Sequence, residues 1–492
     1  MVPLLLLLLV FLLGSLGAEV RVASSTAGGS GGGEGSGTAS GDGAPRVPLL
    51  LLPDAFQSLF DVQTSGKAQP NCTAVGKHRL GWLNETAVGA GCAAALLTRQ
   101  YDSGHEVYKE RDGVTVHLSG SGAGGAKGRV IGEFDAPATT AELKASLGGT
   151  GDMVNYMRDE GGYAEGRDMV VLSYDWRDGA KKTGGPKGTR HAALVSAVEA
   201  LSGANGNQSV VIVGNGLGGL VGYEFLLARD AAWKRKYIAG FVPVATPWFG
   251  RTALIPQLLY PSSDLIVAVD KDRTADMALL RSMQSVVLDL LPSNVRVETP
   301  KGNYSAETLS TLFLAQKNDT ELTRLGGALR NAKARDVTNL THPGVDVYCF
   351  YATNVRTHRT FIYKTDKIDA KPIHPESEAL WGDGLALHES ASACEAWRNV
   401  EGFRFERRES SALRAQFVVG NINVQANLLD ILLAVYARQH GRIVLSDTDG
   451  PPSAFSIVIV ALLAGFSVAI SIFGIRHCVQ RAKDRQGRIP VI

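Results

Sequence analysis

Short apolar runs alternate with longer helical stretches through most of this chain, from residue 47 to about residue 439. The runs that predict strands are residues 47–52, 169–174, 209–213, 241–244, 345–351 and 417–419. The stretches that predict helices are residues 189–201, 220–228 and 428–436. Continuous apolar strands separated by helices indicate a parallel sheet covered on both faces. We therefore predict an α/β fold with a doubly wound, mostly parallel sheet, whose functional site lies at the carboxyl ends of the strands.

Two further apolar segments lie near the ends of the chain. Residues 1–18 carry no charge and end in small residues, which predicts a cleaved signal peptide; an uncleaved anchor is the alternative, because no basic residue precedes the run. Residues 454–475 contain no charge over 22 positions, which is enough for a helix to cross a hydrocarbon core of about 30 Å. A buried core helix is the alternative, but a basic tail follows at 476–492. We therefore predict a single-pass type I membrane protein of the secretory pathway, at the cell surface or in endosomes or lysosomes.

Composition divides the remaining chain into one large domain and two linkers. Residues 19–46 are rich in Gly and Ser and predict a disordered linker, and residues 441–453 predict a juxtamembrane linker. The domain between them, residues 47–440, exceeds the usual size of a single core, so we expect a substantial insertion or two subdomains. The formal net charge of +2 argues against nucleic-acid binding.

Cysteines and glycosylation sequons fit an exported domain. Cys72, Cys92, Cys349 and Cys394 are extracytoplasmic in this arrangement and even in number, which favours two disulfides. Cys478 follows the predicted membrane helix and is either a palmitoylation site or a free thiol. Six Asn-x-Ser/Thr sequons predict a glycoprotein, at Asn71, Asn84, Asn207, Asn303, Asn318 and Asn339.

The glycine-rich segment at residues 214–219 has two interpretations. Read as G-x-G-x-x-G between a strand and a helix, it matches a dinucleotide-binding fingerprint. That interpretation needs an acidic residue about 20 positions on, where residues 237–240 are Tyr, Ile, Ala and Gly. Read as a nucleophile elbow, G-x-S-x-G, the segment fits with Gly216 at the serine position. We favour the elbow, and we expect no dinucleotide, other cofactor or metal.

The surroundings of this turn resemble the lecithin:cholesterol acyltransferase family, which includes lysosomal phospholipase and the phospholipid:diacylglycerol acyltransferases. The resemblance extends in order from residue 47 to residue 436 and is carried by residues 174–177, 232–241, 245–250, 343–351 and 381–384. It implies an α/β-hydrolase fold with cap or lid and membrane-binding-loop insertions. It also implies acyl transfer by serine, aspartate and histidine in that chain order.

Two of the three catalytic positions implied by the resemblance are changed. The acid falls on Asp383, the nucleophile on Gly216 and the histidine on Asn421. Glycine has no side chain to acylate, and an asparagine amide does not titrate near neutral pH, so it cannot serve as a base. The polar pair that follows the acid in the family is replaced here by Leu385 and Ala386.

The resemblance also assigns an oxyanion region, two disulfides and a membrane contact. Asp54 stands where the family has glycine in the oxyanion turn; it either opposes the developing negative charge or points to solvent. The backbone N–H of Leu217 remains as a possible donor. The implied disulfides are Cys72–Cys92, which closes a membrane-binding loop, and Cys349–Cys394. Trp82 in that loop is either a lipid-facing side chain or an ordinary core tryptophan.

These observations predict a membrane-anchored pseudoenzyme that binds lipid or a membrane surface, or a protein ligand. The first alternative is an active O-acyltransferase or phospholipase A with a rearranged site. It would need a substitute nucleophile, for which Ser173 is a candidate, and a substitute base, for which His388 is a candidate, although His388 is more simply a surface residue. The second alternative is an adhesive or structural surface protein that binds no lipid.

Overall fold

The computed structural model describes residues 46–118, 149–180, 189–260, 273–331 and 340–440. Shorter breaks fall at residues 56, 59, 66–75, 81–91, 106, 366–367, 369–370 and 375–378. The predicted signal peptide, linkers, membrane helix and tail lie outside the described residues, as do Asn71, Cys72, Trp82, Asn84, Asn339 and Cys478. None of the described helices is long and apolar enough to cross a membrane.

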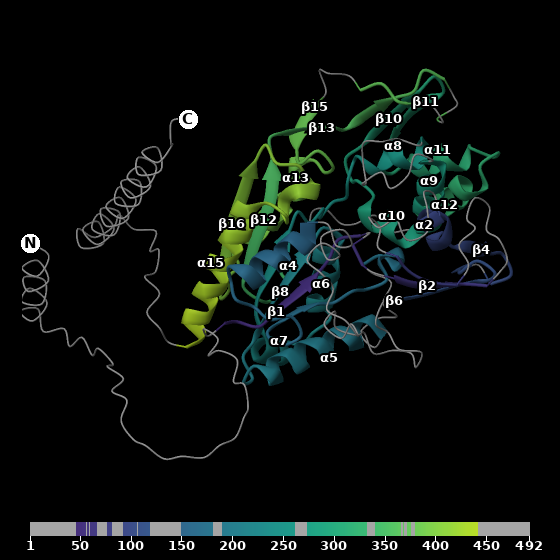
Figure 1. Cartoon of the computed structure of the whole chain (residues 1–492). Coiled ribbons are helices and arrows are strands. Elements are labelled where there is room, and N and C mark those ends of the chain that lie inside the picture. The colour runs from purple at the N-terminus through teal and green to yellow at the C-terminus, as the bar shows by residue number, and fades with distance from the viewer. Residues whose placement is uncertain are drawn as a thin grey trace, which may run out of the picture. The chain divides into compact units, whose positions relative to one another are not determined.

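A six-stranded parallel sheet forms the centre of the fold (Figure 1). Every pairing described within this sheet is parallel. In spatial order its strands are β16 (Phe405–Ser411), β12 (Val347–Thr353), β9 (Ile238–Val244), β8 (Val210–Asn215), β1 (Leu49–Leu52) and β7 (Met169–Val171). The predicted α/β class and parallel sheet are therefore confirmed.

Alternate side chains of the central strands enter two separate cores, one on each face of the sheet. Leu50 and Leu52 belong to the core that contains α5 (Thr189–Ala204) and α6 (Leu217–Leu227). Leu49 and Leu51 belong to the core that contains α4 (Gly149–Asp159) and α15 (Ile422–Gln439). Because successive strand residues point to opposite faces, a continuous apolar run is what a sheet covered by helices on both faces requires.

One predicted strand is wrong. Residues 417 and 418 end a short helix, α14 (Ala415–Val418), and residue 419 follows it as the C-cap. The sixth strand is instead β16. β16 has the sequence FERRESS, in which intermediate and exposed positions alternate from Glu406 onward. An edge strand has a neighbour on one side only and carries charged residues that discourage pairing with other chains. Because its side chains are mostly charged or polar, β16 contains no apolar run that would predict a strand.

Two insertions extend the central sheet and helices. The first lies between β1 and α4 and contains β2 (Phe60–Thr64), β3 (Gly76–Leu80), α2 (Cys92–Leu97), β4 (Gln100–Asp102), β5 (Val107–Lys109) and β6 (Val114–Leu118). The second lies between β9 and β12. It contains α8 (Leu254–Leu259), α9 (Arg273–Ser282), α10 (Gln284–Leu290), β10 (Arg296–Thr299), β11 (Gly302–Ser305), α11 (Leu309–Leu314) and α12 (Thr320–Asn331). α2 packs on α9, and the Tyr108 hydroxyl donates to Glu321 at 2.6 Å, so the insertions contact each other.

Several shorter elements complete the described fold. They are η2 (Trp176–Asp178), α7 (Ala231–Tyr237), β13 (Val355–His358), β14 (Thr360–Ile362), β15 (Ala379–Gly382), α13 (His388–Ala391) and η5 (Ala393–Trp397). β13 pairs with β15 in an antiparallel ribbon, and β15 leads directly into Asp383. The ends of β1, β8, β9 and β15 are followed by the four segments that build the candidate site.

Candidate functional site

Gly216 occupies a tight turn between β8 and α6, with φ 52° and ψ −116°. Its N–H donates to the Val244 carbonyl at 2.9 Å, which fastens the turn to the end of β9. Gly218 leaves no room for a Cβ, because one would overlap the backbone at the end of β1. A strand, a sharp turn at positive φ and a helix form the geometry of a nucleophile elbow. The turn has this geometry, and Gly216 at its centre carries no side chain.

The Asp54 carboxylate lies against this turn rather than in solvent. Its Oδ1 accepts hydrogen bonds from the Leu217 N–H at 2.6 Å and from the Ala55 N–H at 2.8 Å. A Cβ placed on Gly216 would lie well inside 3.0 Å of the Asp54 carboxyl carbon, a separation that real Cβ atoms do not show. The carboxylate therefore fills the space that a side chain at position 216 would enter.

Arg251 lies seven residues after the end of β9 and balances the charge of Asp54. Its Nη2 lies 2.9 Å from Asp54 Oδ2, and the two side chains are 9% and 19% exposed. The Tyr174 hydroxyl donates to the Pro53 carbonyl at 2.7 Å and holds the start of the Asp54 turn. Burial, followed by the charge of Asp54, raises the pKa of Tyr174 well above its ordinary value.

A second set of hydrogen bonds converges on the Gln57 side chain beside the turn. Its Oε1 accepts from the Asp54 N–H at 3.1 Å and from the Thr150 hydroxyl at 2.6 Å. The same oxygen accepts from the Asn215 side-chain amide at 3.2 Å. Polar groups that follow β1, begin α4 and end β8 are thus joined directly beside Gly216, so the turn is braced by contacts from three elements.

Asp383 is a buried carboxylate at the end of β15, 1% exposed. Its Oδ1 accepts from the N–H groups of Leu385 at 2.9 Å and Ala386 at 2.7 Å. Burial raises the pKa of Asp383 above its ordinary value, while these two N–H groups and the charge of Arg251 act in the opposite direction. Arg251 is therefore an electrostatic neighbour of both Asp54 and Asp383.

Asn421 begins α15 as its N-cap. Its side-chain oxygen accepts from the Asn423 N–H at 3.0 Å, and the residue is only partly buried. Its hydrogen bonds are those of a helix start, and they run to its own helix and to the turn before it. The preceding Gly420 packs against Gly149 and Asp152 at the start of α4. The asparagine thus has a structural role that does not depend on proton transfer.

The two substitute residues considered for an active enzyme have separate environments. The Ser173 side chain is 6% exposed, and its Oγ has no hydrogen-bond partner among the described residues. His388 is exposed, and its Nδ1 shares a hydrogen bond with the Thr353 hydroxyl at 3.1 Å. A serine nucleophile requires a base within hydrogen-bond reach. None of the contacts described for these residues joins Ser173 to a histidine.

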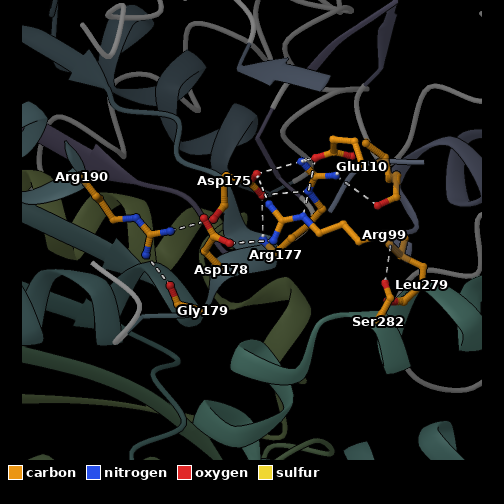
Figure 2. Close-up of polar contacts among 10 residues, drawn as sticks. Arg99, Glu110, Asp175, Arg177, Asp178, Gly179, Arg190, Leu279 and Ser282 are labelled. Carbon is orange, nitrogen blue, oxygen red and sulfur yellow. Dashed lines mark hydrogen bonds and ion pairs between the residues drawn. The ribbon is translucent and has the colours of Figure 1, made fainter. Parts of the chain in front are cut away.

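A cluster of ion pairs at the end of β7 was not predicted from the sequence (Figure 2). Arg177, 2% exposed, binds Asp175 and Glu110, with Nη2–carboxylate distances of 2.8 and 2.9 Å. Arg99 binds Asp175 and Asp178 at 2.8 and 2.6 Å. Figure 2 shows both guanidinium groups converging on the acidic side chains. Because Arg99 and Glu110 come from the first insertion, the cluster fastens that insertion to the central sheet.

The sequence contained partial signals for the missed residues. Asp175 and Arg177 belong to the segment that carries the family resemblance, and Arg251 directly follows another such segment. However, Arg251 and Asp54 are 197 positions apart, and Arg99 and Asp178 are 79 apart. A sequence read without its fold offers no means of pairing residues across such separations.

The described cysteines and sequons agree in part with the predictions. Cys349 and Cys394 form a disulfide with a Cα–Cα distance of 6.5 Å, as predicted. Cys92 is disulfide-bonded as well, and its predicted partner Cys72 lies outside the described residues. Asn207, Asn303 and Asn318 are exposed, and their glycosylation remains a prediction.

Two cavities lie away from the elbow. One, of about 530 Å³, lies between the two insertions and is lined by Arg99, Tyr101, Arg111, Glu321 and Arg324, among others. The other, of about 430 Å³, lies beside Arg281 and Asn318. The lining residues of these two cavities do not include Asp54, Gly216, Asp383 or Asn421. Within the described part of the chain, no group of three or more His, Cys, Asp or Glu residues could hold a metal ion.

The family model described as lecithin:cholesterol acyltransferase matches residues 149–335, which include Gly216 but not Asp54, Asp383 or Asn421. Lysosomal phospholipase A and acyltransferase of Rattus norvegicus is 27% identical over 283 residues, covering 55% of this chain and 63% of the relative. Phosphatidylcholine-sterol acyltransferase of Gallus gallus is 26% identical over 247 residues, covering 49% and 56%.

Among solved structures, the Tle4–Tli4 complex contains a chain that is 11% identical. The likeness covers 80% of this chain and 99% of that one, with a TM-score of 0.44. The chain spans less than two thirds of the length of the curated relatives it matches.

Proposed function

Because this chain belongs to the lecithin:cholesterol acyltransferase family, we propose that it is a catalytically inactive member whose extracytoplasmic domain binds lipid without turning over acyl esters. One observation carries the proposal: the Asp54 carboxylate occupies the space of the nucleophile and bonds the Leu217 N–H. The lack of a side chain at Gly216 thus coincides with an acidic side chain that fills the adjoining space.

Acyl transfer on this fold makes three demands of the site. It needs a side-chain oxygen at the elbow, a titratable partner to deprotonate that oxygen, and free donors for the developing oxyanion. Gly216 supplies no oxygen, and the Asn421 amide does not titrate and caps α15 instead. The Leu217 N–H, which could serve as an oxyanion donor, already donates to the negatively charged Asp54 carboxylate. Loss of the nucleophile or the base alone lowers turnover by about 10⁶-fold in a comparable triad.

The lipid ligand is proposed from the relatives and from the sequence. The matched relatives are by name a phospholipase A and acyltransferase and a phosphatidylcholine-sterol acyltransferase. The packed cores on both faces of the sheet support a domain that stays folded without its chemistry. We propose that the domain is a secretory-pathway glycoprotein, anchored by residues 454–475 and contacting the membrane through the loop that contains Trp82.

The first test is catalytic. The wild-type chain is incubated with a fluorophosphonate probe and, separately, with phospholipid vesicles that contain an alcohol acceptor. We expect no labelled serine and no release or transfer of acyl chains above a heat-denatured sample. Labelling that disappears in Ser173→Ala would overturn the proposal and establish the active acyltransferase or phospholipase alternative.

The second test concerns the ligand. Purified full-length protein is extracted with organic solvent for lipid mass spectrometry and is tested in parallel for exchange of a fluorescent phosphatidylcholine. We expect a co-purifying lipid in stoichiometric amount and saturable exchange. Protein that carries no lipid and exchanges none would favour a protein ligand or a purely adhesive role instead.

A further inference from the structure

We infer that the turn around Gly216 retains a preformed carboxylate-binding site, and that the chain's own Asp54 fills it as an internal ligand. The inference rests on the proposed function, because it names what closes the site in an inactive chain. It goes further in predicting that Asp54 and a side chain at position 216 exclude each other. It also predicts that a small external carboxylate can replace the Asp54 side chain.

Three segments contribute the donors of this site. The Ala55 N–H follows β1, the Leu217 N–H begins α6, and the Arg251 guanidinium follows β9. Two N–H groups meet Oδ1 of Asp54 at 2.8 and 2.6 Å, and the guanidinium meets Oδ2 at 2.9 Å. Both oxygens of one carboxylate are thus engaged at distances typical of charge-assisted hydrogen bonds. The arrangement matches a carboxylate in shape and in charge.

The buried positive charge of Arg251 favours an anion in this site. The residue is 8% exposed, so its charge is largely removed from water. Asp54 makes a direct ion pair with Arg251, whereas Asp383 acts on Arg251 only through its charge, so removing the Asp54 side chain takes the paired carboxylate from a buried guanidinium, which is destabilising. The N-terminus of the eleven-residue α6 adds a partial positive charge at Leu217. If the Asp54 side chain were removed, these donors would remain in place and would favour another anion.

Asp54 and a side chain at position 216 exclude each other because they would occupy the same space. The carboxylate is held by three donors, so it cannot yield to a new Cβ without losing hydrogen bonds. Gly216 also has a positive φ, which non-glycine residues adopt only with strain. A substitution at Gly216 therefore meets two penalties, and only the steric one depends on Asp54. Gly206 has φ +68°, and a Cβ added there would meet no atom within 4 Å, so it supplies a control for positive φ alone.

The first experiment measures rescue by acetate. Melting temperatures of full-length wild type, Asp54→Ala, Asp54→Asn and Asp54→Ala/Arg251→Met are recorded in sodium acetate and in sodium chloride of equal ionic strength. We expect Asp54→Ala to melt several degrees below wild type and to regain part of that loss, saturably, in acetate. Wild type, Asp54→Asn and the double variant should show no acetate-specific rise. A folded Asp54→Ala chain that does not respond to acetate would overturn the inference.

The second experiment measures the coupling between positions 54 and 216. Gly216→Ala should lower the melting temperature more than Gly206→Ala does in the wild-type background, a comparison that does not require Asp54→Ala to fold. The loss caused by Gly216→Ala should shrink in the Asp54→Ala background and persist with Asp54→Asn, whose side chain keeps its volume. Gly206 lies in the turn before β8, whereas Gly216 follows that strand, so Gly206→Ala should be additive with Asp54→Ala. Equal losses at Gly206 and Gly216, or additivity at Gly216, contradict the inference.

Neither experiment relies on catalysis, so the two proposals can fail separately. An active wild-type enzyme would remove the proposed function and leave the acetate and coupling results to be judged on their own. An inactive wild type without acetate rescue or coupling would remove only the internal ligand.

Discussion

At the scale of single residues, Asp383, the acid that the family resemblance implies, lies in an environment that penalises its charge. Burial raises its pKa above the ordinary value of 3.8, so the folded state releases this proton less readily than the unfolded chain. Such a shift leaves stability unaffected below the unfolded pKa. It lowers stability progressively as the pH rises from 3.8 through the folded pKa.

Asp383→Asn should therefore raise the melting temperature at about pH 7. An asparagine oxygen can still accept from the Leu385 and Ala386 N–H groups while the buried charge is removed. The gain over wild type should diminish as the pH falls toward 3.8, because wild-type Asp383 then becomes neutral as well. Thermal unfolding from neutral pH down to about pH 4 measures this difference, with the exposed Asp159→Asn as control. A variant that is less stable than wild type at neutral pH would show that Asp383 is held chiefly as a carboxylate partner.

At the scale of elements, the start of α15 explains why an asparagine suits position 421. A helix leaves its first N–H groups without partners inside the helix, and the Asn421 side chain satisfies the one on Asn423. Histidine is a poor N-cap. A histidine at this position would therefore weaken the start of α15.

Replacing this cap has a predictable effect on stability. Asn421→Ala and Asn421→His should each lower the free energy of unfolding by about 1 kcal/mol, whereas Asn421→Asp, which can still cap, should stay close to wild type. Urea denaturation followed by circular dichroism measures all three variants. An alanine variant as stable as wild type would mean that the Asn423 N–H finds an equally good partner elsewhere.

At the scale of the whole molecule, the ion-pair cluster of Figure 2 connects the first insertion to the end of the central sheet. Burial works against ionisation of Asp175, but the hydrogen bonds and charge of Arg177, with the charge of Arg99, hold its pKa below the ordinary value of 3.8. A depressed carboxylate pKa stabilises the fold above the unfolded pKa. That contribution is lost as the pH falls through the folded pKa, so the cluster should weaken below about pH 4.

Arg177→Gln should be among the most destabilising single substitutions in this chain. It leaves Asp175 and Glu110 without the buried guanidinium between them, a loss of about 3–5 kcal/mol in unfolding free energy. Arg158→Gln removes a partly exposed arginine paired with the exposed Asp159 and should change stability by less than about 1 kcal/mol. Urea unfolding at neutral pH compares the two. Similar losses for both variants would show that the buried cluster is not what fastens the insertion.

The sequence by itself determined the features that depend on neighbouring residues. Alternation of apolar runs with helical stretches specified five of the six central strands, because a strand buried on both faces is apolar throughout. The sequence also shows the turn at residues 214–219, because a turn depends on only a few adjacent residues. It shows as well that Gly216 offers no nucleophilic side chain. The apolar pattern does not predict β16, because an edge strand with one neighbour can carry charges along its length.

Only the tertiary structure decided what fills the elbow and what holds the insertions. The sequence left the Asp54 carboxylate either in solvent or beside the turn, and its contacts with Leu217 and Arg251 join residues 163 and 197 positions apart. Arg99 and Glu110 likewise reach Asp175 and Arg177 from a separate insertion. Which charge meets which partner over such distances depends on how strands and loops are brought together in space. Hydrophobic periodicity carries no information about that pairing, because it records only whether each position is buried.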